Sequence, residues 1–199
     1  MARQSSSSSS CSLSNDFTCY DVFISFRGTN TRYGFTGNLY KALSAKGIHT
    51  FIDDKELKRG EEIKSSLLKG IEHSRIAIII FSEDYASSSF CLDELVHIIH
   101  YFKEKDRLVL PVFYGVEPAQ VRHQNDSYGE ALAKHEKRFE NNKEKMELLQ
   151  KWKNALKEAA GLSGHHFNQG YPFLFQSCFN SLSSIFSDIY FQYIILTIC

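Results

Sequence analysis

The chain has 199 residues, 43% of them hydrophobic and 16 of them phenylalanine, which is enough apolar material for one globular domain with short extensions. Lysine plus arginine and aspartate plus glutamate each total 23, so the net charge gives no reason to expect a nucleic acid or another polyanion as partner. The five cysteines are scattered without a C-x-x-C pair, which argues against a zinc site or a disulfide framework and favours a reducing compartment.

Residues 1–17 contain a run of serines from Ser5 to Ser10 and are expected to form a disordered leader. Such a segment has too little apolar surface to offset the entropy of ordering it. Serines, rather than an apolar stretch, follow the first residues, so the sequence does not fit a secretory signal. The expected location is the cytoplasm, with the nucleus as an alternative.

Strand and helix patterns alternate through the middle of the chain. In chain order, the sequence predicts a strand at 20–26, a helix at 35–43, a strand at 48–52, a helix at 63–71, a strand at 76–80, a helix at 95–102, a strand at 108–113, and helices at 127–139 and 148–159.

Local signals refine the second half of this pattern. Pro111 lacks a backbone N–H, which suggests that its strand lies at an edge or is irregular there. A loop is expected through residues 118–122, and Ser127 with Glu130 forms a capping-box pattern that would open the next helix. The last helix is expected to end at Gly161 or Gly164, and His165 and His166 are expected to close the same helical region.

The alternation predicts an α/β fold, namely a flavodoxin-like three-layer sandwich with a parallel sheet and helices on both faces. If the strand order is 2-1-3-4, the switch point lies between the first and third strands. Residues 27–32 and 82–90 would then line the crevice outside the carboxyl ends of these strands, and both segments are rich in polar side chains.

Over residues 18–170 the chain resembles the Toll/interleukin-1 receptor (TIR) domain of plant immune receptors. The motifs that carry the resemblance are Tyr20-Asp-Val-Phe-Ile-Ser-Phe-Arg-Gly28, Gly47-Ile-His-Thr-Phe51, Leu57-Lys-Arg-Gly-Glu61, Tyr85-Ala-Ser-Ser, Cys91-Leu-Asp-Glu-Leu95, Leu110-Pro-Val-Phe-Tyr114, Tyr128-Gly-Glu-Ala131 and Lys134-His-Glu136. The resemblance implies a flavodoxin-like fold, self-association, signalling in plant defence and NAD+ hydrolase activity.

Glu94 is the candidate catalytic residue. From its spacing alone, a glutamate near a helix start is a solvated charge that the helix dipole favours. The resemblance implies instead that it is the glutamate that cleaves the bond between nicotinamide and ribose in NAD+. That reaction develops positive charge on the ribose and releases a neutral leaving group, so it needs a nearby carboxylate and no general acid.

The positive charges of Arg27 and Arg32 suit a pyrophosphate, and Gly28 would let the backbone approach one closely. From these residues alone, a solvated loop is the plainer interpretation. The resemblance implies that NAD+ contacts Arg27, Gly28, Thr29, Asn30, Thr31, Arg32, Gly60 and Phe90. NAD+ is then the substrate, and no separate cofactor is expected.

The family commonly has Glu-Asp where Thr29 and Asn30 stand, Trp in place of Phe90, and in the first helix a contact-forming His in place of Asn38. Two interpretations of Phe90 stay open, namely a ring that stacks on the nucleotide and a core anchor for the third helix. These departures keep an alternative function open, a non-catalytic TIR adaptor that binds other TIR-containing immune receptors.

Other side chains near Glu94 are given structural roles. Asp93 would point about 100° away on a helix, which disfavours a paired-carboxylate mechanism. Cys91 is interpreted as a buried small hydrophobe rather than a nucleophile. His97 and His100 share a helix face, but no third ligand accompanies them, so no metal is expected.

Residues 53–60 form either a solvated connector or, as the resemblance implies, a loop that packs on a neighbouring subunit and completes its active site. Residues 171–199, a divergent hydrophobic tail, are interpreted as sequence from beyond a splice junction. A packed helix is an alternative, and a membrane anchor is disfavoured because the apolar end from 189 to 199 is far short of about 20 residues. The expected partners are NAD+, further copies of the chain and other TIR-type receptors.

Overall fold

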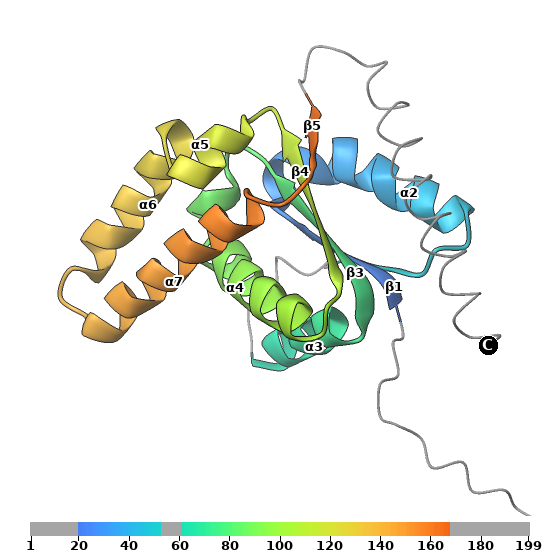
Figure 1. The fold of residues 1–199 in the computed structure, drawn as a ribbon, viewed down its shortest axis with the longest axis horizontal. Coiled ribbons are helices and arrows are strands. Elements are labelled where there is room, and N and C mark those ends of the chain that lie inside the picture. The colour runs from blue at the N-terminus through green and yellow to red at the C-terminus, as the bar shows by residue number, and fades with distance from the viewer. Residues whose placement is uncertain (1–19, 53–60, 168–199) are drawn as a thin grey trace, which may run out of the picture.

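One parallel sheet lies at the centre of the computed structural model, which describes residues 20–52 and 61–167 (Figure 1). Within those residues the strand order is β2-β1-β3-β4-β5, and every neighbouring pair is parallel. The strands are β1 (Tyr20–Phe26), β2 (Thr50–Ile52), β3 (Ser74–Phe81), β4 (Leu108–Tyr114) and β5 (His165–Phe167). The predicted 2-1-3-4 order is therefore confirmed, with a fifth strand added at one edge.

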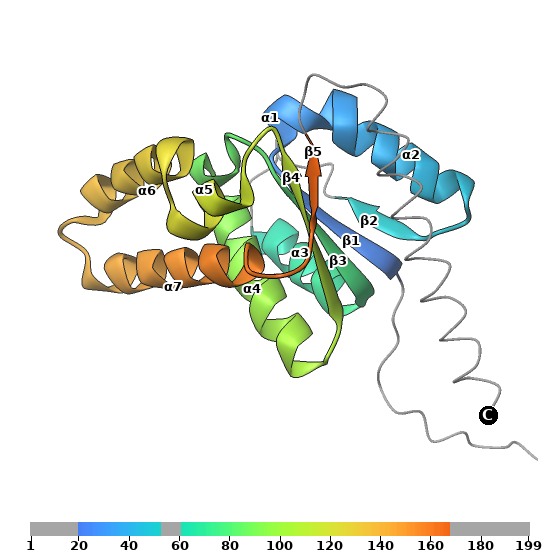
Figure 2. The same ribbon diagram turned by 45° about the horizontal axis from the view of Figure 1, so that its top comes forward.

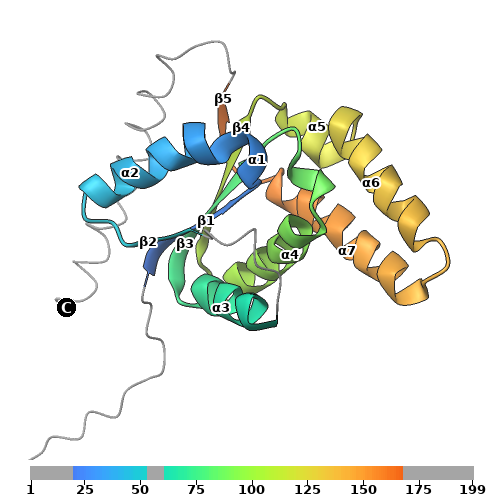
Figure 3. The same ribbon diagram turned by 180° about the vertical axis from the view of Figure 1, so that it is seen from behind.

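Helices cover both faces of this sheet, so the predicted three-layer fold is confirmed. They are α1 (Gly28–Thr31), the π-helical η1 (Arg32–Thr36), α2 (Gly37–Ala45), α3 (Glu61–Glu72), the 3-10 turn η2 (Tyr85–Ser87), α4 (Ser89–Glu104), α5 (Pro118–His123), α6 (Asp126–Phe139) and α7 (Lys143–Ala159). Figure 2 and Figure 3 show α2 on one face and α3 and α4 on the other, with α5, α6 and α7 beyond α4.

The sheet is buried on both sides, which explains why its central strands are apolar without alternation. Successive side chains of a strand point to opposite faces, so each strand supplies two cores. In β3, Ile76, Ile78 and Ile80 join the cluster that packs under α2. The intervening Ala77 and Ile79 join the larger cluster formed with α3, α4, α6 and α7.

The β5 strand contradicts the prediction that His165 and His166 end the last helical region. The α7 helix ends earlier, at Ala159, and the two histidines begin β5, where His165 pairs with Val112 and His166 with Phe113. A strand of three residues is too short to show a two-residue period, so local sequence carries no signal for it.

Pro111 lies in β4, which is flanked by β3 and β5, so the strand as a whole is not an edge strand. Pairing with β5 begins only at Val112, one residue later. Just before β5 the chain runs against Pro111, because a Cβ placed on Gly164 would lie 2.4 Å from the Pro111 carbonyl oxygen. Pro111 therefore lies in the part of β4 that is not yet paired with β5. The absence of a side chain on Gly164 permits the close approach of the two segments.

Two helix starts differ from the prediction. The expected loop through residues 118–122 is the helix α5, and its start is closed by a capping box between Glu117 and Gln120. The capping box expected at Ser127 is absent, because α6 begins at Asp126 with Asn125 as its cap. Elsewhere the predicted second strand is shorter than expected and starts at Thr50 rather than residue 48.

Candidate functional site

The candidate site lies at the carboxyl ends of β1 and β3, where the strand order reverses direction. The chain leaves β1 for β2 on one side, whereas β3 lies on the other side, and such a switch point is where open α/β sheets bind ligands. Figure 3 shows α1 at this end of the sheet, near the turn that leads from β3 into α4. The two segments expected to line the crevice therefore do lie at the same end of the sheet.

Glu94 is carried into the interior by the second turn of α4. The helix begins at Ser89, and its cap Ser88 accepts a hydrogen bond from the Cys91 N–H at 3.3 Å. Cys91 lies on the face that meets β1, since its Sγ is 3.6 Å from the Phe26 carbonyl oxygen. Glu94 follows three residues later on the same face and is only 5% exposed. Carboxylates are almost never this buried on a helix without a specific reason.

Tyr85 from η2 lies within the electrostatic influence of this carboxylate. Its hydroxyl lies 2.8 Å from Ser25 Oγ, near the end of β1, and donates a hydrogen bond to the Cys91 carbonyl oxygen at 3.2 Å. Complete burial, followed by the negative charge of Glu94, raises the pKa of Tyr85 well above its ordinary value. The phenol therefore stays neutral and polar next to the carboxylate.

The predicted loop of residues 27–32 is largely helical, which corrects the expectation of a loop. Gly28–Thr31 form α1, and Arg32 opens η1. Thr31 Oγ1 donates to the Arg27 carbonyl oxygen at 3.1 Å, and the Arg32 guanidinium lies 5.0 Å from the centre of the Phe26 ring. This segment leaves the carboxyl end of β1 directly, so Arg27, Gly28 and Arg32 lie at the same end of the sheet as Glu94.

Three further candidates have only partial or no placement. The backbone of Thr29 and Asn30 belongs to α1. Gly60 lies outside the described residues, as does the whole segment 53–60, so its expected role at a neighbouring subunit stays a prediction.

Phe90 lies on the surface of the first turn of α4, and this position contradicts its interpretation as a core anchor. Its side chain is 36% exposed, whereas the next two residues, Cys91 and Leu92, are buried in the core cluster. The buried position of Cys91 confirms that it is a core residue. The exposed part of Phe90 is compatible with contact to a nucleotide.

Asp93 and Glu94 point in different directions, as expected from their spacing. The Asp93 carboxylate faces α7, where it accepts a hydrogen bond from Trp152 Nε1 at 2.9 Å. It therefore has a structural partner on the side of α4 that faces α7. The two histidines of this helix also have separate partners, His97 with Glu72 at 3.3 Å and His100 with Glu104 at 3.6 Å.

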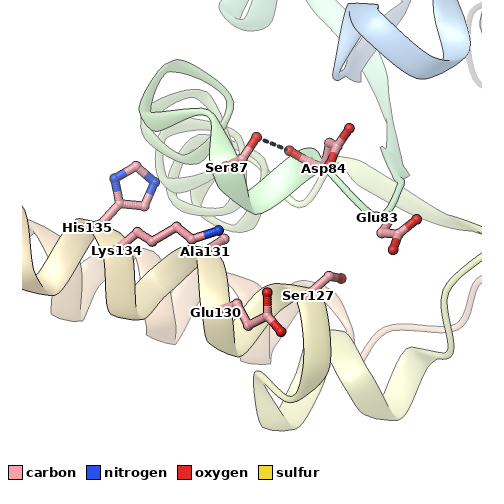
Figure 4. Close-up of a pocket in the computed structure, with 8 residues that line it drawn as sticks. All are labelled: Glu83, Asp84, Ser87, Ser127, Glu130, Ala131, Lys134 and His135. Carbon is pink, nitrogen blue, oxygen red and sulfur yellow. Dashed lines mark hydrogen bonds between the residues drawn. The ribbon is translucent and has the colours of Figure 1, made fainter.

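A separate cavity of about 240 Å3 opens between η2 and α6 (Figure 4). Acidic and hydroxyl side chains surround it together with one lysine; the lining residues are Glu83, Asp84, Ser87, Ser127, Glu130, Ala131, Lys134 and His135. None of the residues expected to bind NAD+ lines it, so we do not assign it to the candidate site.

The buried tyrosines predict a loss of stability in alkali. Burial raises the pKa of both Tyr85 and Tyr128 well above 10.0. Above pH 10 the unfolded chain releases protons that the folded chain keeps, so the free energy of unfolding falls as pH rises, by up to about 1.4 kcal/mol per pH unit for each tyrosine. Below pH 10 neither state releases them. Urea unfolding from pH 9 to 11.5 measures this slope.

Tyr128→Phe is the control for that measurement, because it removes one of the two groups and keeps the ring. For Tyr128→Phe, the free energy of unfolding should fall less steeply above pH 10 than for the unaltered protein, and the difference is the contribution of one tyrosine. Equal slopes for the two proteins would show that Tyr128 is not the source of the alkaline instability.

Within residues 20–52 and 61–167, no helix is long and apolar enough to cross a membrane. Over the same residues, no group of three or more histidine, cysteine, aspartate or glutamate side chains has an arrangement that could hold a metal ion.

Comparisons with known proteins add to this geometry. The family model described as "TIR domain" matches residues 19–172. Disease resistance protein RPV1 of Vitis rotundifolia is 53% identical over 164 residues, covering 82% of this chain, and TMV resistance protein N of Nicotiana glutinosa is 48% identical over 145 residues, covering 73%. The chain spans only 11% and 12% of the length of these two relatives.

Among solved structures, the TIR domains of the activated Roq1 resistosome, which directly recognises the pathogen effector XopQ, are 45% identical to this chain. The match has a TM-score of 0.72 and covers 85% of this chain and 99% of the other. At this identity and coverage, the likeness extends over most of this chain.

Proposed function

Because this chain belongs to the TIR domain family and resembles plant disease resistance proteins, we propose that it is an NAD+ nucleosidase that acts in plant innate immune signalling. The observation that supports this most directly is the burial of Glu94 at the switch point of the sheet. A buried carboxylate at the end of the sheet where ligands bind is placed to act on a bound substrate. A solvated carboxylate on a helix surface is not.

The proposed reaction breaks the bond between the nicotinamide nitrogen and the ribose. The pair of bonding electrons leaves with the nicotinamide, which departs as a neutral molecule, and positive charge develops on the ribose. The Glu94 carboxylate stabilises that charge, and its effect is large because the surroundings have a low dielectric constant. Water then adds to the ribose and loses a proton to solvent, which gives ADP-ribose. No metal or additional cofactor takes part.

The remaining candidates would hold the rest of NAD+. Arg27 and Arg32 carry positive charge at the same end of the sheet as Glu94, and both suit the pyrophosphate. Gly28 lets the backbone approach a phosphate closely, and the neighbouring Thr29 and Asn30 would add polar contacts. Thr31 does not fit its expected role in binding NAD+, because it is fully buried and its hydroxyl is bonded to the Arg27 carbonyl oxygen. Phe90 would stack on a ring of the nucleotide through its exposed face. Gly60 would contribute from the segment 53–60.

Self-association is part of the proposal. Tyr33 in η1 is 97% exposed, and Tyr40 lies seven residues further along α2 and is also exposed. Large aromatic side chains in solvent favour contact with a partner surface. The same feature supports the second candidate function, a TIR adaptor that pairs with other TIR-containing receptors without turnover. The proposed location is the cytoplasm or the nucleus.

Nicotinamide release from NAD+ by the purified protein tests the proposal, with Glu94→Ala as the comparison. We expect the specific activity to rise with protein concentration and the variant to be inactive at every concentration. The double variant Tyr33→Ser and Tyr40→Ser should need a higher concentration for the same specific activity. If the unaltered protein and Glu94→Ala release nicotinamide at equal rates, the enzymatic function is wrong and the adaptor function is favoured.

A further inference from the structure

The hydroxyl of Tyr85 joins the sheet to the helix that carries Glu94. It donates its single hydrogen to the Cys91 carbonyl oxygen at 3.2 Å, so at the 2.8 Å contact the Ser25 hydroxyl must be the donor. Hydrogen bonds therefore run from β1 through the phenol into the first turn of α4. Ser25 lies 60 residues before Tyr85 in the sequence, and the phenol joins it to the Cys91 carbonyl in one chain of contacts.

The phenol is itself held firmly. Tyr85 has no exposed surface, and its ring meets the Phe81 ring edge-on at 5.0 Å between centroids. Well-packed interiors leave little room for such a ring to move. The distance between Ser25 and the Cys91 carbonyl is thus fixed, and Glu94 projects from the next turn of the same helix face.

We propose that Tyr85 is a positioning residue for Glu94, which it serves by binding Ser25 and Cys91 and so holding the α4 turn against the carboxyl end of β1. This inference rests on the proposed function, because positioning has a catalytic consequence only if Glu94 acts on a substrate. A displacement of about 1 Å in a reacting group can cost about a hundredfold in rate. A contact that fixes the helix turn therefore affects catalysis without touching the substrate.

The same helix turn offers a matched comparison on the side that faces α7. Asp93 accepts the hydrogen bond from Trp152 at 2.9 Å, so it also ties α4 to a neighbouring element. This contact leads toward α7 and away from Ser25. If the only effect were a general loosening of α4, losing either contact would lower the rate. If Tyr85 positions Glu94, only the loss of the Tyr85 contact lowers it.

Steady-state kinetics of NAD+ cleavage by Tyr85→Phe and Asp93→Ala test the proposal. Tyr85→Phe keeps the ring and should lower kcat about tenfold with little change in KM. Asp93→Ala should change neither quantity. A Tyr85→Phe enzyme with the kcat of the unaltered protein would overturn the proposal.

A readout without turnover separates this proposal from the proposed function. With 13C-labelled glutamate, the carboxyl resonance of Glu94 is identified by its loss in Glu94→Gln. Tyr85→Phe should shift that resonance, and Asp93→Ala should leave it in place. If the unaltered protein is inactive but the shift appears, the enzymatic function fails and the structural contact stands. If the resonance does not move in Tyr85→Phe, the positioning role is wrong whatever the activity.

Discussion

Glu94→Gln should lower the rate of NAD+ cleavage by at least about a hundredfold while the protein stays folded. Glutamine has nearly the shape of glutamate, so it fills the same space against β1 and removes only the negative charge. If the carboxylate works by stabilising positive charge on the ribose, a neutral amide in the same place cannot replace it. Initial rates of nicotinamide release at saturating NAD+ measure this effect.

Asp93→Asn is the matched control for Glu94→Gln, because the two carboxylates are neighbours on one helix. The amide oxygen of the substituted side chain can still accept from Trp152, so the contact made at this position is kept. Asp93→Asn should therefore retain the rate of the unaltered protein. Substantial activity in Glu94→Gln would mean that the charge of this residue is not needed, and the electrostatic mechanism would be abandoned.

Trp152→Ala should destabilise the fold by about 3–5 kcal/mol, the largest effect expected of any single core substitution here. Trp152 is the largest fully buried side chain within the described residues, with 1% exposure. Its ring meets His135 at 5.1 Å and Phe139 at 5.7 Å between centroids, so it joins α6 to α7, and its N–H binds Asp93 of α4. Small domains have about 5–15 kcal/mol of stability in total, so this loss is a large share of it.

Urea unfolding followed by circular dichroism measures that loss, because the variant lacks the only tryptophan of the chain. A cycle of Trp152→Phe and Asp93→Ala isolates the hydrogen bond from the packing. The double variant should be less destabilised than the sum of the two single variants, since each alone removes the same bond. A change of under about 1 kcal/mol in Trp152→Ala would show that α7 does not depend on this side chain.

The central strands and the layered fold were predictable because their signal is local. A strand buried on both faces must be apolar throughout, and residues 76–80 meet that condition without any knowledge of their neighbours. Helix faces likewise appear as a period of 3.6 residues. The boundaries were less accurate where the element is short, as in β5 and α5, because three to six residues do not complete a pattern.

The candidate site was predictable in its residues but not in its contacts. The motif around Glu94 identifies this carboxylate, yet spacing alone favours a solvated side chain. The Asp93 bond to Trp152 and the Tyr85 bond to Ser25 join residues 59 and 60 positions apart. No local pattern encodes such pairs, because they form only when separate elements pack together.

By itself, the sequence determined the order of the first four strands and of the long helices, the apolar faces that build two cores, and the identity of the carboxylate proposed to be catalytic. The tertiary structure decided which of two adjacent carboxylates faces the sheet, that Phe90 lies on the surface, and that two histidines start an edge strand. The physical reason is that periodicity reports the environment of a single helix or strand. The direction and partners of a polar side chain depend on what other elements place beside it.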